Sequence, residues 1–250
     1  MKLSFSIPAY NEEKNIWRCL DSIFQELKGK KYQVEIIVVD NNSTDRTAEI
    51  AKSYAGVRVV PETKKGLLYA RERGYETATG DLIANVDADT ILTPGWIDTV
   101  FQEFEENPNL VALSGPYVYY DLPPLVQMVT KFFYSFGYIV HRFNLLFGGN
   151  GTMLQGGNFV LRKTALDAIG GFNTDIAFYG EDTDIAVRMS TVGKIKFTYR
   201  LPMKTSGRRL AEEGVVTTGF RYAINHFWML LFKKPFTVKY GDVRAPEKTT

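Results

Sequence analysis

Short runs of apolar residues alternate with amphipathic segments through the first 115 residues of the chain. Apolar runs of about four to eight residues between turn residues are typical of buried strands. Runs of this kind lie at residues 3–7, 34–39, 57–60, 82–86 and 110–113. The segments between them carry apolar residues at helical spacing, such as Ile16, Leu20 and Ile23. This alternation of strand and helix predicts an α/β fold with a mostly parallel sheet between helices.

Polar residues ahead of the helical segments predict where the helices begin. Asparagine, serine and threonine side chains accept hydrogen bonds from the N–H groups of a first helical turn. Residues of these types that precede predicted helices are Asn11, Ser43 or Thr44, Thr93 and Thr164. We therefore expect each of these side chains to cap a helix.

The second half of the chain has a weaker strand pattern and ends its predicted sheet at residues 194–199. A glycine turn at Gly156 and Gly157 precedes a short predicted strand. Ile185, Met189 and Val192 then form an apolar helical stripe, which places Glu181 and Asp182 at the N-terminus of that helix.

Two aromatic-rich segments, residues 123–147 and 217–236, have broad apolar helical faces with Lys and Arg nearby. Interfacial helices that lie on a membrane combine the same two features. A dimer seam and an ordinary core helix would need the same apolar face, so these three interpretations stay open. The polar end at residues 241–250 is predicted to be frayed.

Composition narrows the classes of function. Lys and Arg total 30 against 28 Asp and Glu, a net charge of +2, which argues against nucleic acid as the main partner. The single cysteine, Cys19, excludes an internal disulfide and a cysteine-based zinc site. The first residues lack the apolar core of a signal peptide, and no apolar stretch reaches about 18 residues. We expect a cytoplasmic protein, with the inner face of the cell membrane as its alternative location.

Acidic side chains follow several of the predicted strands. Asp87 and Asp89 come directly after the run 82–86, and acids also lie in the loops 8–12 and 40–45. In an open α/β sheet the ligand crevice lies outside the carboxyl ends of the strands. Two carboxylates there suit Mg²⁺ or Mn²⁺ shared with a substrate phosphate. An Asx-turn into the next segment is the alternative reading of Asp87 and Asp89.

Basic side chains and glycines lie close to these acids in the sequence or in the predicted fold. Arg71 is placed to approach a diphosphate, although a solvated arginine is equally consistent with the sequence. Arg208 and Arg209 either close over the same diphosphate or belong to a solvated basic loop. Gly157 either lets the backbone approach a donor sugar or makes an ordinary tight turn.

Taken in order, several of these segments resemble the motifs of the family 2 glycosyltransferases. The matching segments are residues 6–12, 37–45, 70–71, 87–89 and 180–184, and the resemblance covers roughly residues 3–200. It implies the GT-A fold and an inverting transferase that uses a nucleotide-activated sugar, with UDP- or GDP-sugars as donors. The processive members carry a Gln-x-x-Arg-Trp element near residue 208, which this chain lacks, so repeated polymer extension is not expected.

The resemblance also implies roles for individual residues. Asp182 of the Glu181–Asp182 pair would be the catalytic base, and its place at a helix N-terminus predicts that it is ionised at neutral pH. Asp89 would bind the metal, and Asp87 would face both the ribose and the metal. The remaining residues of the expected donor site are Pro8, Ala9, Tyr10, Glu12, Asp40, Asn42, Arg71, Ala88, Gly157, Arg208 and Arg209.

These expectations combine into one catalytic domain, residues 1–200, followed by a C-terminal loop and apolar helix in residues 201–250. Residues 1–115 would bind the nucleotide, and residues 116–200, with the helix at 123–147, would bind the acceptor. The expected acceptor is a hydroxyl group on a lipid-linked or envelope glycan.

The alternatives are transfer to a polyprenyl phosphate and a catalytically silent nucleotide-sugar-binding subunit. A sugar-phosphate nucleotidyltransferase would usually begin with a glycine-rich phosphate loop, and residues 8–13 contain no glycine.

Overall fold

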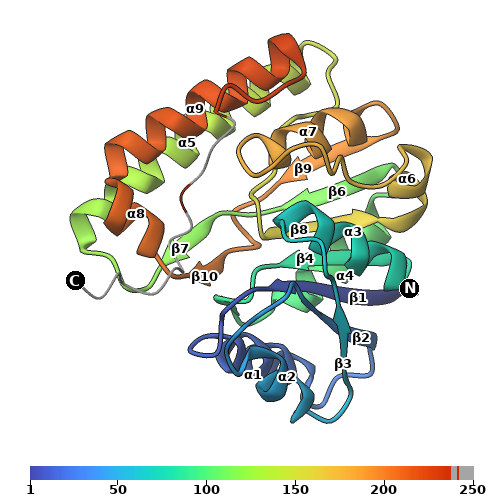
Figure 1. Cartoon of the computed structure of the whole chain (residues 1–250). Helices are drawn as coiled ribbons and strands as arrows, with labels where there is room; N and C mark the ends of the chain where they lie inside the picture. Colours follow the sequence, from blue (N-terminus) through green and yellow to red (C-terminus); the bar gives the residue numbers. More distant parts are fainter. Residues whose placement is uncertain (238–240, 242–250) are drawn as a thin grey trace, which may run out of the picture.

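A seven-stranded sheet forms the centre of the protein (Figure 1). The computed structural model describes residues 1–237 and residue 241. The strands, in the spatial order β3-β2-β1-β4-β8-β6-β9, are β3 Val57–Pro61, β2 Gln33–Asp40, β1 Lys2–Ala9, β4 Leu82–Val86, β8 Asn158–Arg162, β6 Leu110–Ser114 and β9 Lys194–Phe197. Within this sheet β8 runs antiparallel to both of its neighbours, and the other pairs are parallel. The predicted mostly parallel sheet is confirmed.

Helices cover both faces of this sheet. One core cluster joins β1 and β4 to α1 Ile16–Leu27, α2 Thr47–Lys52 and α4 Trp96–Glu106. A second cluster on the other face joins β2, β6 and β8 to α3 Leu67–Thr77, α6 Lys163–Ala168 and α7 Glu181–Ser190. Both clusters consist of fully buried side chains such as Phe5 and Phe159, so the sheet is buried on both sides, as its continuous apolar runs require.

A second, three-stranded sheet was not predicted. Its order is β5-β10-β7, formed by β5 Thr90–Leu92, β10 Met203–Thr205 and β7 Tyr117–Tyr119. β5 begins directly after Asp89, and β10 ends three residues before Arg208. Because β10 pairs with β5, this small sheet brings Arg208 to the acids at the end of β4.

The two aromatic-rich segments are long helices that lie side by side, away from the central sheet (Figure 1). They are α5 Pro124–Leu146 and α9 Val215–Phe232, with the short α8 Arg208–Glu213 before α9. Many of their large apolar side chains are exposed, for example Phe132 at 70% and Leu231 at 75%. The core interpretation is therefore wrong for this face. Within the described chain, neither these helices nor any other is both long and apolar enough to cross a membrane.

The predicted helix caps are wrong. α1 begins at Ile16, and Asn11 instead uses its side-chain oxygen to accept a hydrogen bond from the N–H of Thr44 at 2.9 Å. α4 begins at Trp96, and the Thr93 hydroxyl donates to the carbonyl of Pro202 at 2.6 Å. Thr164 lies inside α6, and α2 begins only at Thr47, after both Ser43 and Thr44. Asn11, Ser43 and Thr93 form hydrogen bonds with distant parts of the chain instead. The predicted polar end, beyond Gly241, lies outside the described residues.

Candidate active site

The loops after β1 and β2 are joined to each other at the carboxyl edge of the sheet. The backbone N–H of Asn11 donates to Ser43 Oγ at 3.1 Å, and that of Glu12 donates to Thr47 Oγ1 at 2.7 Å. β1 and β2 are parallel with Ala9 opposite Asp40, so both loops leave the sheet at the same level. The expected meeting of strand-end loops is confirmed.

A small cavity of about 50 Å³ lies at this edge. Its wall includes these residues expected in the donor or metal site: Pro8, Ala9, Tyr10, Glu12, Asp87, Ala88, Asp89 and Arg209. Asp40 and Asn42 line neither this cavity nor the larger one described below. Asp40 instead accepts a hydrogen bond from the N–H of Ser43 at 3.2 Å, and Asn42 is exposed with φ 65°.

Asn41, which the sequence analysis missed, lies in the wall of this cavity. Its side-chain nitrogen donates to the carbonyls of Glu62 and Lys64, and its oxygen accepts from the N–H of Gly66 at 2.8 Å. Asn41 therefore fixes the loop before α3 against the end of β2. The left-handed conformation of Asn42, which asparagine tolerates, turns the chain away from the cavity.

Arg71 is buried beneath the acids. It is 1% exposed, pairs with Glu181, and lies 3.4 Å from Asp87 Oδ1. Its guanidinium also lies over the ring of Phe159. The solvated alternative for Arg71 is wrong, because the partner of this cation comes from α7, 110 residues later in the chain. Arg71 links the end of β4 to the start of α7.

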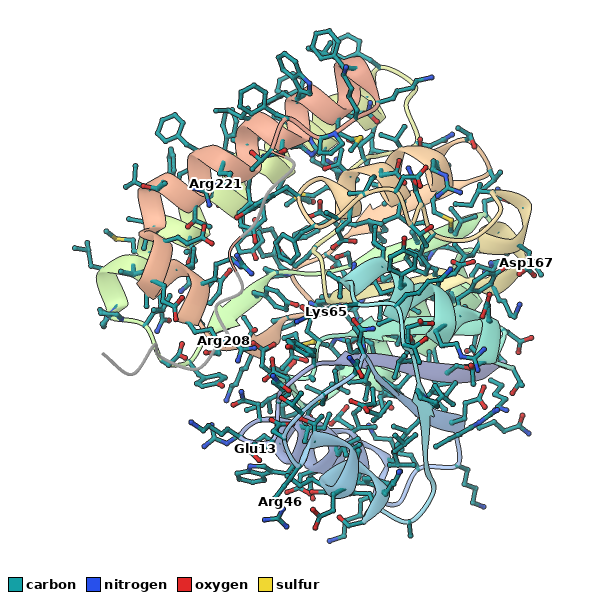
Figure 2. The ribbon with its side chains drawn as sticks, viewed as in Figure 1. Glu13, Arg46, Lys65, Asp167, Arg208 and Arg221 are labelled. Carbon is teal, nitrogen blue, oxygen red and sulfur yellow. The ribbon has the colours of Figure 1, made fainter. Side chains whose placement is uncertain are left out.

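Arg208, the first residue of α8 (Figure 2), pairs with the acids Glu12 and Asp89. Its Nη2 lies 2.9 Å from Asp89 Oδ2, and both of its terminal nitrogens bond to Glu12. Arg209 stacks over Phe178, pairs with Glu213 at 2.7 Å, and lines both cavities. The solvated-loop alternative is wrong for both arginines, which supply positive charge where strand-end carboxylates gather.

Asp87 and Asp89 have the donor set of a hard divalent cation. No group of three or more His, Cys, Asp or Glu side chains in the described part of the chain has the arrangement of a metal site. Two carboxylates nevertheless fit Mg²⁺ or Mn²⁺, because these ions take their remaining ligands from water and substrate phosphates. Both aspartates line the small and the large cavity, so oxygen ligands from a diphosphate can reach them.

Gly157 lies behind Asp87 with φ 77°. A Cβ at this position would overlap the Asp87 carboxylate and the hydroxyl of Tyr117. That hydroxyl donates to the carbonyl of Gly156 at 2.6 Å and to Asp87 Oδ2 at 3.3 Å. Glycine is therefore needed at position 157 because the backbone approaches Asp87 closely. Tyr117 is a further site residue that the sequence analysis missed.

Asp182 is the more accessible member of the acid pair at the start of α7. Both residues line the larger cavity, but Glu181 is buried against Arg71, whereas Asp182 is half-buried. Asp182 Oδ1 accepts from the N–H of Thr183 at 2.8 Å, and Thr183 Oγ1 lies 2.9 Å from Nδ1 of His226 on α9. His226 thus lies beside the acid pair.

Burial dominates the electrostatics of this pair. It raises the pKa of Glu181 to about 7, against the opposing charge of Arg71. Burial also raises the pKa of Asp182, against the opposing charge of His226. The helix N-terminus favours the ionised form of Asp182, so the helix dipole and burial act on its pKa in opposite directions. A raised pKa is typical of a carboxylate that exchanges protons near neutral pH.

A larger cavity of about 370 Å³ begins at these acids. Its polar end is formed by Arg71, Asp87, Asp89, Asp182 and Arg208. From there it continues along the facing sides of α5 and α9. Asp182 and the strand-end pair Asp87 and Asp89 therefore share one space that a substrate can enter.

The sequence model described as glycosyl transferase family 2 matches residues 4–170. A dolichol-phosphate mannosyltransferase from Pyrococcus furiosus is 38% identical over 122 residues, which are 47% of this chain and 34% of that protein. The chain thus spans about a third of the length of this relative.

Two solved structures share the fold at 19% identity. The mannosyltransferase PcManGT from Pyrobaculum calidifontis, in complex with GDP-Man and Mn²⁺, has a TM-score of 0.68, with 92% of this chain and 64% of that chain covered. S. aureus TarS 1-349, in complex with UDP-GlcNAc, has a TM-score of 0.59, with 82% and 58% covered. The expected GT-A fold is confirmed.

Proposed function

The chain belongs to glycosyl transferase family 2, and on this basis we propose that it is an inverting glycosyltransferase. It moves a sugar from a nucleotide-diphosphate sugar to an acceptor hydroxyl. The observation that carries this proposal is the junction of the two cavities at Asp87 and Asp89. The small cavity has the strand-end position of a nucleotide site, and the larger one presents Asp182 to an acceptor.

In this proposal the donor binds at the strand-end edge where the small cavity lies. Pro8, Ala9, Tyr10 and Glu12 form the wall of that cavity after β1, and Asn41 and Ala88 extend it from the neighbouring loops. The diphosphate lies toward Arg208 and Arg209, since guanidinium groups match phosphate geometry. UDP- and GDP-sugars are both candidates, as the structural neighbours hold UDP-GlcNAc and GDP-Man.

Asp182 removes the proton of the acceptor hydroxyl as its oxygen attacks the anomeric carbon opposite the departing diphosphate. Arg71 neutralises Glu181 and holds the Asp87 carboxylate in place. Asp89 and Asp87 would hold a Mg²⁺ or Mn²⁺ ion, which would supply positive charge to the leaving diphosphate. Arg208 and Arg209 add positive charge to the same site.

The same proposal assigns the parts of the chain. Residues 1–115 form the nucleotide-binding half and residues 116–200 the acceptor half, which includes the helix at 123–147. Residues 201–250 add α8, which carries Arg208 and Arg209, and α9. A catalytically silent nucleotide-sugar subunit would have no use for a base, and a phosphate acceptor is already anionic, so the accessible Asp182 favours a hydroxyl acceptor.

Thermal melting with a panel of nucleotide sugars tests the proposal. We expect one UDP- or GDP-sugar to raise the melting temperature in the presence of Mn²⁺, and to raise it less in a chelator, because ligands stabilise only the folded state that binds them. The same donor should then be consumed when an acceptor is added. A full panel that leaves the melting temperature unchanged would contradict donor binding.

The exposed face of α5 and α9 is the proposed contact with a membrane. Its exposed apolar side chains include Phe132, Phe136, Phe143, Phe147, Phe220, Phe227 and Leu231. No acidic residue occurs between Asp121 and Asp167, or in residues 214–237, whereas Lys131, Arg142, Lys233 and Lys234 are exposed. A two-fold dimer through this face would place like charges against each other. An anionic bilayer matches both the charge and the apolar surface.

We expect the purified protein to co-sediment with vesicles that contain anionic lipid, and less so at 1 M salt, where charges are screened within about 3 Å. Changing Lys233 and Lys234 together to glutamate should weaken sedimentation at low salt. Neutral vesicles are the control. A stable dimer with no vesicle binding at low salt would support the dimer-seam interpretation instead. The protein would then be located away from the membrane.

A further inference from the structure

The larger cavity changes character along its length. Its charged lining residues all lie at the end near Asp182, on β4, α3, α7 and α8 or in adjoining loops. Among the described residues that line it, those from α5 and α9 include no Asp, Glu, Lys or Arg. Typical members are Phe133 and Val140 from α5, and Val215 and Ala223 from α9. The cavity therefore joins a charged centre to an apolar groove between two helices.

Small residues keep this groove open. Gly137, Gly219 and Ala223 lie in its wall. A Cβ at Gly219 would come within 2.9 Å of the Phe133 ring, and one at Gly137 within 3.2 Å of Met153. The two helices thus approach each other closely at Gly219, while the groove runs on beside that contact.

Two buried polar atoms line the groove without a hydrogen-bond partner among the described residues. They are Thr218 Oγ1, on a residue that is 0% exposed, and His141 Nδ1, on a residue that is 3% exposed. Burial lowers the pKa of His141 to about 4, so its ring is neutral at pH 7. Both side chains are uncharged, so neither brings a charge to the wall of the groove.

The groove opens on the apolar face of the same helices. Phe136 and Phe227 line the cavity and are also 53% and 45% exposed, so they stand at its mouth. A water-soluble glycan would need polar partners along its length, whereas most of the surface of this cavity is apolar. A hydrocarbon chain needs none, and its transfer from water to an apolar wall is favourable for every methylene buried.

We propose that the groove between α5 and α9 binds the hydrocarbon chain of a lipid-linked acceptor, whose hydroxyl-bearing head lies at Asp182. This proposal rests on the proposed glycosyltransferase function and names the acceptor class of the same site. The chain leaves the groove between Phe136 and Phe227, toward the exposed apolar face. The head and the donor sugar then meet where the two cavities join.

The test compares dodecyl β-glucoside, below its micelle concentration, with methyl β-glucoside as calorimetric probes without donor. We expect the dodecyl compound to bind at least about tenfold more tightly, since each buried methylene adds to affinity. Ala223→Trp fills the groove and should remove that advantage. Ala211→Trp makes the same change on the exposed side of α8, outside the cavity, and should keep affinity within about twofold.

Thermal melting establishes that each variant is folded, and Ala223→Leu replaces Ala223→Trp if the larger side chain prevents folding. Equal binding of the two glucosides, or equal losses in the Ala223 and Ala211 variants, would overturn the groove assignment. Donor binding is measured separately on the same preparations. Donor binding with no chain preference defeats only the groove assignment, and chain binding without any donor binding defeats the proposed function.

Discussion

Replacing Asp89 with asparagine is expected to abolish detectable sugar transfer while leaving the fold intact. Asparagine keeps the size of the side chain but removes the charge that a hard divalent cation requires. Losing one stabiliser of transition-state charge typically lowers turnover by about 10²–10³-fold. The Mn²⁺-dependent part of donor affinity should disappear as well, and calorimetry with and without chelator measures it directly.

Asp175→Asn is the matched control, because Asp175 is exposed and lines neither cavity. It should retain both turnover and the effect of Mn²⁺. The Asp89 variant also weakens the pairing of Asp89 with Arg208. An Arg208→Lys variant that keeps the Mn²⁺ effect would separate the two contributions. Full turnover of the original protein in excess chelator would rule out the metal assignment.

The main sheet was predictable because its strands are buried on both faces. Such strands are continuous apolar runs, and residues 34–39 and 82–86 fall within β2 and β4. The small sheet of β5, β7 and β10 was not predictable. Each of its strands has three residues, which is too short for a pattern, and the pairing joins segments more than 100 residues apart.

The predicted helix starts were wrong for a related reason. A capping side chain can instead bond to a tertiary partner, and the sequence does not reveal which partner is nearby. Asn11 bonds to Thr44, and Thr93 to Pro202. Local capping preferences, typically worth about 1 kcal/mol, are small enough for a tertiary hydrogen bond to replace them.

The positions of Asp87 and Asp89 at the carboxyl edge followed from the strand pattern alone. The environment of Arg71 did not, because it depends on Phe159 and Glu181, which the fold brings from distant parts of the chain. The raised pKa of Asp182 did not follow from the sequence either, because the sequence shows the helix N-terminus but not the burial. Choosing Asn42 instead of Asn41 for the donor site was wrong, because Asn42 lies in a backbone turn that only the structure reveals.

Replacing Asp182 with asparagine is expected to lower turnover by roughly 10²–10⁴-fold, the usual contribution of a positioned general base. Donor affinity should change by less than about twofold, because a base acts in the transition state and not in donor binding. Asparagine keeps the size and much of the capping ability of the side chain, so the fold should survive. Calorimetry with the donor measures donor affinity, and product release from the same preparation measures turnover.

Asp184→Asn is the matched control, because Asp184 lies in the same first turn of α7 but pairs with Arg188 and does not line the cavity. Its turnover should stay close to that of the original protein. The pH dependence gives a second readout. Asp182 acts only when deprotonated, and burial raises its pKa, so turnover should fall as the pH decreases through that raised pKa, earlier than for an exposed aspartate. This acidic limb should vanish in Asp182→Asn.

Near-normal turnover of Asp182→Asn with weakened donor binding would make Asp182 a binding residue. A hydroxyl acceptor has a proton that must be removed during attack, whereas a phosphate acceptor is already an anion at neutral pH. Loss of the base without loss of turnover would therefore indicate a lipid phosphate as the acceptor. The groove between α5 and α9 would serve its hydrocarbon chain equally well, so the Asp182 variant decides the chemistry of the acceptor head independently of its tail.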